Sequence, residues 1–145
     1  MFNLKSIIAV AVLFIAGVTA ANAQLVDGST IKVTVPNSFV LRDETFEAGD
    51  YTIERTPSTA DSPSLLILRG NGDAIIFDTV ASHTNEASAT TQLVFDTVGD
   101  TNFLSEILVK GAAVKTEIPK TKAQKKAMSA NSSIRNYLTI TNTGF

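Results

Sequence analysis

SLLILRGNGDAIIFDTV, residues 64–80, has the clearest hairpin pattern in this chain. Two β-prone runs, Ser64–Arg69 and Ala74–Val80, flank the turn residues Gly70-Asn71-Gly72-Asp73. An Asn-Gly pair supplies the positive φ angles that a tight hairpin turn requires. The stretch therefore predicts an antiparallel β-hairpin.

Strand patterns continue towards the N-terminus. Apolar and polar residues alternate in Ile31–Val35 and in Tyr51–Arg55, as they do in half-buried strands. Pro36 ends the first run because proline cannot donate a hydrogen bond to a ladder. A short β-prone segment, Phe39–Leu41, follows it.

A second hairpin is predicted towards the C-terminus. Gln92–Val98 and Asn102–Lys110 are β-prone runs on either side of Gly99-Asp100. Two polar stretches rich in breakers, 56–63 and 81–91, are predicted to be loops.

The tetrapeptide Phe-Asp-Thr-Val occurs twice, at 77–80 and at 95–98. In each copy Phe and Thr share one strand face, while Asp lies on the other. Two copies do not indicate a solenoid, which needs at least three repeats.

The C-terminal part combines a basic helix with a further β-prone run. Lys120–Met128 is rich in Lys and Ala and lacks Gly, so it predicts a short exposed helix. Ala130–Ser133 breaks this helix. Ile134–Thr141 is interpreted either as one more strand or as a partly ordered terminal arm.

These patterns together predict an all-β fold. We expect a single β-sandwich or a small barrel of about seven or eight short antiparallel strands, with a short basic C-terminal helix. The predicted segments are a signal peptide at 1–23, a β domain at 24–118, a basic helical segment at 119–130 and a C-terminal strand or arm at 131–145.

The N-terminus has the features of a cleaved secretory signal peptide. Lys5 supplies a positive charge, Ile7–Val18 is an uncharged and largely apolar run, and Ala21-Asn22-Ala23 fits a signal peptidase site. A bilayer-spanning helix needs about 20 apolar residues, so this run is too short for one. We therefore expect export to the periplasm or the medium, cleavage after Ala23, and no stable membrane insertion afterwards.

Composition narrows the function classes. Removing 23 of the 145 residues leaves 122, enough for one domain with a hydrophobic core. The chain has no cysteine, which excludes disulfides, thiol catalysis and thiolate metal sites.

Charge is distributed unevenly along the chain. Gln24–Val109 has a net charge of −9, whereas the residues from Lys110 onward carry +6. The basic segment could contact an anionic surface, but a solvated helix that complements an acidic body is the preferred interpretation. It lacks interleaved aromatic residues for stacking on bases, so no nucleic-acid partner is expected.

Residues of a Ser/His/Asp set are present, but no motif joins them. His83 is the sole histidine, and Ser82 or Ser88 with Asp78 or Asp96 could complete such a set. No nucleophile-elbow motif surrounds either serine. An exposed loop histidine is therefore the preferred interpretation of His83.

Strand carboxylates and oxygen-rich turns offer further candidates. Glycoside hydrolysis uses paired carboxylates, but alternation places the strand acids equally well on the solvent face of a sheet; these acids are Glu54, Asp78, Asp96 and Glu106. The turns Asn71-Gly72-Asp73 and Asp96–Asp100 lack the EF-hand pattern for calcium. With one histidine and no cysteine, a zinc site would rest on carboxylates. The sequence thus predicts no catalytic residue, no metal ligand and no cofactor.

Several turn-and-strand motifs occur in a characteristic order: Val35-Pro36 followed by Phe39, then Ala48–Ile53, Leu93–Phe95, and Gly99 with Phe103–Ile107. This order resembles a group of small exported bacterial proteins that are numerous in Acidobacteria and similar soil bacteria. The resemblance covers roughly residues 31–126 and implies a β-rich exported domain. The group has no assigned activity, so the resemblance implies no functional residues. This chain departs from the group's pattern at Glu47, where proline is usual, and at Asn37-Ser38.

The preferred hypothesis is an exported, non-enzymatic β-module that binds or assembles in the periplasm or at the cell surface. The run Tyr137–Thr141 could add to the sheet edge of a neighbour and so give self-association.

Two alternative functions remain open. A small extracytoplasmic hydrolase would place a strand acid in a pocket beside another acid, with Asp78, Asp96 and Glu106 as the candidates. A carrier of a hydrophobic ligand would have a cavity lined by Phe77, Phe95 and Phe103.

Overall fold

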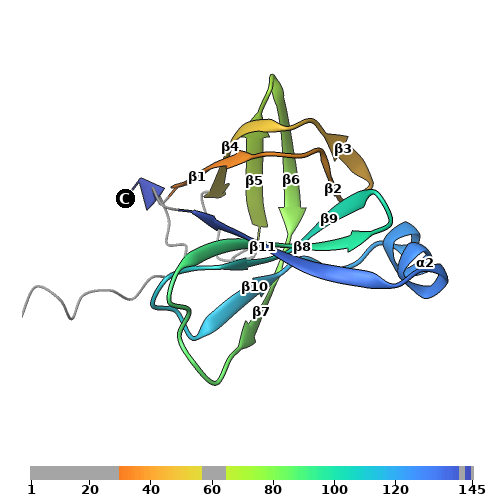
Figure 1. Ribbon diagram of the computed structural model, residues 1–145. Coiled ribbons are helices and arrows are strands. Elements are labelled where there is room, and N and C mark those ends of the chain that lie inside the picture. The colour runs from red at the N-terminus through yellow and green to blue at the C-terminus, as the bar shows by residue number, and fades with distance from the viewer. Residues whose placement is uncertain (1–29, 57–64, 141–142, 145) are drawn as a thin grey trace, which may run out of the picture.

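Two β-sheets packed face to face and one short helix make up the fold (Figure 1). The structure is a computed structural model that describes residues 30–56, 65–140 and 143–144. Its strands are β1 (Thr30–Val35), β2 (Phe39–Leu41), β3 (Glu44–Phe46), β4 (Gly49–Arg55), β5 (Leu65–Gly70), β6 (Asp73–Asp78), β7 (Val80–His83), β8 (Thr91–Val98), β9 (Thr101–Leu108), β10 (Val114–Glu117), β11 (Ser133–Ile140) and β12 (Thr143–Gly144). The predicted all-β class is confirmed, and the two separate sheets correspond to the sandwich alternative.

The first sheet has the strand order β12-β1-β4-β5-β6. Its β5–β6 hairpin is the one predicted from residues 64–80, with Gly70 opposite Asp73 at the end of the ladder. Asn71 and Gly72 have φ angles of 49° and 81°. Two successive positive φ angles are the mark of the type I′ turn, whose twist matches that of the flanking strands.

The second sheet has the strand order β11-β8-β9-β10-β7, with β2 and β3 attached beside β9. The predicted β8–β9 hairpin is confirmed, and Gly99 adopts a φ of 60° in its turn. The run beyond the helix is a strand rather than an arm, because β11 pairs with β8 from Ser133 through Ile140.

Within the described residues the chain forms twelve strand segments, more than the seven or eight predicted. The additional segments are short, and several are paired by partners that lie far away in the sequence. Part of the predicted 81–91 loop belongs to β7, which pairs with β10, and part of the charged 42–47 stretch is β3. The local sequence pattern does not identify such short strands, because whether they form depends on the strand with which they pair.

The hydrophobic core lies between the two sheets. Side chains that face the opposite sheet are contributed by both, in the alternation typical of a sandwich. Four aromatic rings meet in its centre: Phe39 stacks on Phe46 at a centroid distance of 5.4 Å and meets Tyr51 and Phe95 edge to face. The fully buried residues around them include Ile31, Leu41, Ile53, Leu66, Leu68, Leu93 and Ile107.

The helix α2 (Lys122–Ala130) connects β10 to β11. The predicted helix began two residues earlier, at Lys120, because the sequence pattern did not identify its cap. Thr121 is that cap, and its hydroxyl accepts a hydrogen bond from the Gln124 backbone at 3.2 Å.

No helix within the described residues has the length and hydrophobicity needed to cross a bilayer. The predicted signal peptide, 1–23, lies outside the described residues.

Candidate functional site

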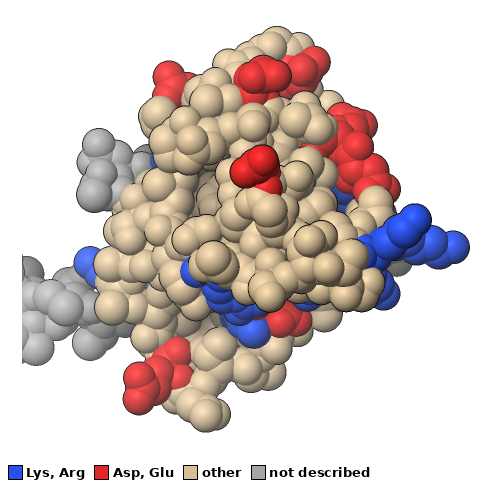
Figure 2. Space-filling model, turned by 45° about the vertical axis from the view of Figure 1, so that its right-hand side comes forward, with Lys and Arg blue, Asp and Glu red and all other residues tan. Residues whose placement is uncertain are grey.

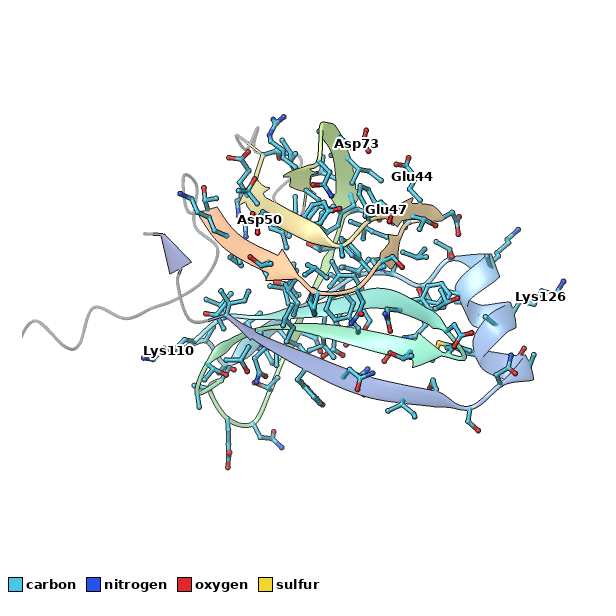
Figure 3. All side chains as sticks on the ribbon, turned by 45° about the horizontal axis from the view of Figure 1, so that its top comes forward. Glu44, Glu47, Asp50, Asp73, Lys110 and Lys126 are labelled. Carbon is cyan, nitrogen blue, oxygen red and sulfur yellow. The ribbon has the colours of Figure 1, made fainter. Side chains whose placement is uncertain are left out.

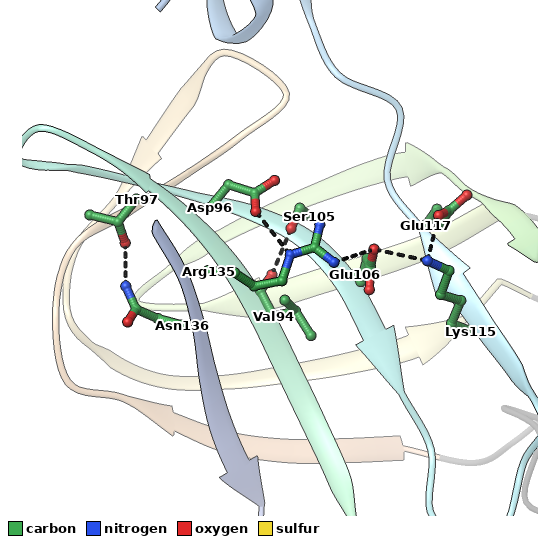
Figure 4. A network of polar contacts seen from close by, with 9 residues as sticks. All are labelled: Val94, Asp96, Thr97, Ser105, Glu106, Lys115, Glu117, Arg135 and Asn136. Carbon is green, nitrogen blue, oxygen red and sulfur yellow. Dashed lines mark hydrogen bonds and ion pairs between the residues drawn. The ribbon is translucent and has the colours of Figure 1, made fainter. Parts of the chain in front are cut away.

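Charged side chains gather on the face of the second sheet that points away from the first (Figure 4). Cross-strand pairing brings them together, because residues directly opposite each other share a face. Arg135 of β11 lies opposite Asp96 of β8, and Glu117 of β10 lies opposite Glu106 of β9. Four strands thus contribute to one polar network, which also contains Lys115 of β10.

The network is continuous from β11 to β10. Arg135 contacts Asp96 from Nε to Oδ1 at 3.3 Å, and contacts Glu106 from Nη1 to Oε1 at 3.1 Å. Lys115 Nζ lies 3.2 Å from the same Glu106 oxygen and 3.0 Å from Glu117 Oε1. Glu106 is therefore shared by two cations.

Burial makes this network unusual for the outer face of a sheet. The side chains of Asp96 and Glu106 are only 4 % and 8 % exposed. Their expected position on a solvent-exposed face was wrong. Asp96 Oδ2 has no hydrogen-bond partner among the described residues. Burying a carboxylate is costly unless it is paired, so Arg135 compensates for much of this cost.

Both cations are stabilised in their charged forms. Burial alone lowers the pKa of Arg135, but Coulombic attraction from Glu106 and Asp96 outweighs it, so the net pKa is raised. The pKa of Lys115 is raised chiefly by its hydrogen bonds to Glu117 and Glu106. The network thus keeps two positive charges facing buried acids.

A pocket of about 220 Å³ lies beside the network and is relevant to the hydrolase hypothesis. Glu106 and Glu117 both line it, together with Ser105 and Lys120. Each of the two acids is, however, ion-paired with Lys115, and Glu106 is also paired with Arg135. The arrangement links neighbouring strands and presents no carboxyl group that is free of a cation.

The other predicted catalytic candidates are dispersed. Asp78 is exposed and pairs with Arg42 at 3.4 Å. His83 is an exposed residue of β7, and the Ser88 hydroxyl donates to the carbonyl of Thr90. Glu54 pairs with Arg69 at 2.9 Å, on the first sheet. The structure does not assemble these residues into a Ser/His/Asp set.

The three phenylalanines considered for a ligand cavity do not share one face. Phe77 and Phe95 belong to the core between the sheets. Phe103 lies opposite Asp96, and therefore on the outer face of the second sheet. A cavity lined by all three is incompatible with this register.

The Asn71 turn, one of the two considered for calcium, has a structural role. The Asn71 amide donates to the Tyr51 hydroxyl at 3.0 Å, and that hydroxyl donates to the Glu47 carbonyl. Burial is the main reason that the pKa of Tyr51 is raised. In the described parts of the chain, no group of three or more His, Cys, Asp or Glu residues is placed to hold a metal ion.

A groove of about 320 Å³ opens between β11 and the corner from β1 to β2. Along it, the Asn136 amide donates to Thr97 Oγ1 at 2.7 Å, and Thr97 donates to Asn102 Oδ1 at 2.7 Å. Asn102 in turn donates to the Ser38 carbonyl at 3.2 Å. This chain of hydrogen bonds fixes the β11 side of the groove to the corner on its other side.

Acidic residues gather over the upper part of the surface in Figure 2, and further acidic residues lie lower down, some of them beside basic ones. Figure 3 shows Asp50 and Asp73 on strands of the first sheet, Glu44 and Glu47 on and just after β3, and Lys126 projecting from α2. These four acids and Lys126 thus lie at separate places in the fold.

Strand β11 forms one edge of the second sheet. It pairs with β8, and no other strand of the described residues pairs with its outer edge. Figure 3 shows β11 running along the border of the molecule. Two large apolar side chains on it are exposed, Ile134 by 65 % and Tyr137 by 57 %.

Comparisons with known proteins find no matching family model, no similar curated protein and no similar solved structure. The resemblance to small exported bacterial proteins stays a prediction. Sequence reasoning identified Asp96 and Glu106 as candidates but missed Arg135 and Lys115, their ion-pair partners. The burial of Asp96 could have been inferred from Val94-Phe95-Asp96-Thr97-Val98, because alternation places Asp96 on the same strand face as two valines.

Proposed function

We propose that this protein is an exported, non-enzymatic β-sandwich module that assembles with other protein chains by adding a strand to the free edge of β11. A partner strand would use the unpaired backbone groups of that edge for hydrogen bonds, and the adjacent side chains for specificity.

The observation that carries the proposal is that β11 itself has none of the features that usually protect a sheet edge. Natural proteins protect sheet edges by lysines, prolines, bulges or very short strands. β11 has eight residues, no lysine and no proline, and its register with β8 is uninterrupted. Its exposed Ile134 and Tyr137 add apolar area beside the free backbone.

The charge of β11 is also neutralised. Arg135 is its only charged residue, and its guanidinium pairs with Asp96 and Glu106 across the neighbouring strands. A charge held back over the sheet repels an approaching strand less than one that extends from the edge. By holding the Arg135 charge away from the edge, the polar network leaves the outer edge of β11 open to pairing with another strand.

Light scattering after size-exclusion chromatography tests the proposal on residues 24–145. Deleting β11 would uncover Asp96, so point substitutions are the cleaner perturbation. We expect an oligomer that Ile134→Lys converts to a monomer. Ile76→Lys is the matched control, because Ile76 is 60 % exposed on β6, at an edge of the other sheet. A wild-type chain that stays monomeric over a concentration series would refute assembly through this edge.

Export is tested separately. Expression of the whole chain in a Gram-negative host, followed by N-terminal sequencing of the periplasmic fraction, should identify Gln24 as the first residue. Retention in the cytoplasm with Met1 intact would contradict the proposed export.

A further inference from the structure

We infer that the strand added to β11 is the β11 of a second copy of this chain, in antiparallel pairing about a two-fold axis at Asn136. This inference rests on the proposed function, and it names the partner and the register. A two-fold axis makes the interface self-complementary and closes the assembly at a dimer.

The register follows from strand geometry and from the side chains of β11. In a continuous sheet, residues directly opposite each other lie on the same face, so an axis perpendicular to the sheet must pass through a residue position. The central positions of Ser133–Ile140 are Asn136 and Tyr137. These two registers each pair seven of the eight residues of the strand, more than any other register does.

The register centred on Asn136 gives complementary pairs. It places Ile134 opposite the second copy's Leu138, and Arg135 opposite the second copy's Tyr137. Apolar residues then meet on one face, and on the other the aliphatic stem of Arg135 meets an aromatic ring while its guanidinium stays on Asp96 and Glu106. The register centred on Tyr137 instead places Asn136 opposite Leu138, which pairs an amide with an apolar side chain.

The same register accounts for the exposed Ile134. This residue lies opposite Thr97, on the face of β11 that points to the groove, yet 65 % of it is exposed. Leu138 lines the groove of about 320 Å³. The second copy's Ile134 would lie beside Leu138 at the open side of this groove. Each groove is thus completed by a residue from the other copy.

Single-cysteine crosslinking tests the register, because the natural chain has no cysteine. In the inferred dimer position 136 faces itself, so Asn136→Cys should form a disulfide-linked dimer on oxidation. Thr139→Cys is the matched control, since position 139 faces position 133 of the second copy and should stay monomeric on a non-reducing gel. The double variant Ile134→Cys, Leu138→Cys retains Asn136 and should also crosslink.

Dimer affinity provides an independent measurement. The two-fold axis duplicates the Ile134–Leu138 pair, so Ile134→Ala should weaken the dimer about tenfold. An oligomer that crosslinks through Tyr137→Cys, or through none of these positions, would overturn the inferred register while leaving assembly intact. A chain that is monomeric and uncrosslinked in every variant would overturn the proposed function as well.

Discussion

Replacing Arg135 by methionine removes the cation that lies between two buried acids, and its effect on stability can be worked out from the network. Asp96 would lose its one ion-pair partner among the described residues, whereas Glu106 would keep Lys115. Removing one member of a fully buried pair costs about 3 to 5 kcal/mol. The Arg135 side chain is 41 % exposed, so solvent screening reduces the value of the pair. We therefore expect a loss of about 2 to 3 kcal/mol in the free energy of unfolding.

Urea denaturation followed by circular dichroism measures this loss. With a slope of about 1.5 kcal/mol per molar urea, the midpoint should fall by about 1.3 to 2 M. The double variant Arg135→Met, Asp96→Asn is the control, because it removes the buried charge together with its partner. It should recover a large part of the lost stability, and the double-mutant cycle would give the coupling energy of the pair. A loss below about 0.5 kcal/mol in the single variant, the level typical of surface substitutions, would refute the reasoning.

Two further perturbations test other parts of the structure. Gly70→Ala should lower the melting temperature by roughly 6 to 12 °C, an overpacking cost of about 2 kcal/mol. A Cβ at this position would lie 2.5 Å from the carbonyl oxygen of Asp50 and against the ring of Tyr51; an unchanged melting curve would contradict this packing. Lys115 has a pKa raised above 10.5, so its stabilising effect is complete below that pH and is lost as the pH rises through the folded-state pKa. Unfolding midpoints measured from pH 8 to pH 12 should therefore fall more steeply for the wild type than for Lys115→Met, and parallel curves would count against the ion pair.

For the polar network, the sequence was enough to identify the two acids but not their cationic partners. Asp96 and Glu106 were candidates because acids on strands are chemically conspicuous. Arg135 is 39 positions from Asp96 in the chain, and Lys115 became a partner only when β10 paired with β9. No local spacing links these residues. The free edge of β11 depends likewise on which strands follow one another in the sheet, although the exposed run itself could be identified from its β-prone residues.

The repeated Phe-Asp-Thr-Val tetrapeptide separates local from tertiary determinants. Alternation was sufficient to predict that Phe and Asp lie on opposite faces in both copies, and the structure buries both phenylalanines, with Phe77 2 % and Phe95 6 % exposed. It could not predict the environments of the two acids. Asp78 lies on an edge strand with its side chain 54 % exposed, whereas Asp96 lies in a central strand with its side chain 4 % exposed.

Residue-by-residue alternation and turn chemistry act over a few positions, so the amino-acid pattern was enough to predict the all-β class and both hairpins. Strand order, the pairing of β11 with β8 and the burial of Asp96 result from contacts between segments that are far apart in the chain. Those contacts were decided only by the tertiary structure, because each strand's environment depends on its neighbours in the sheet.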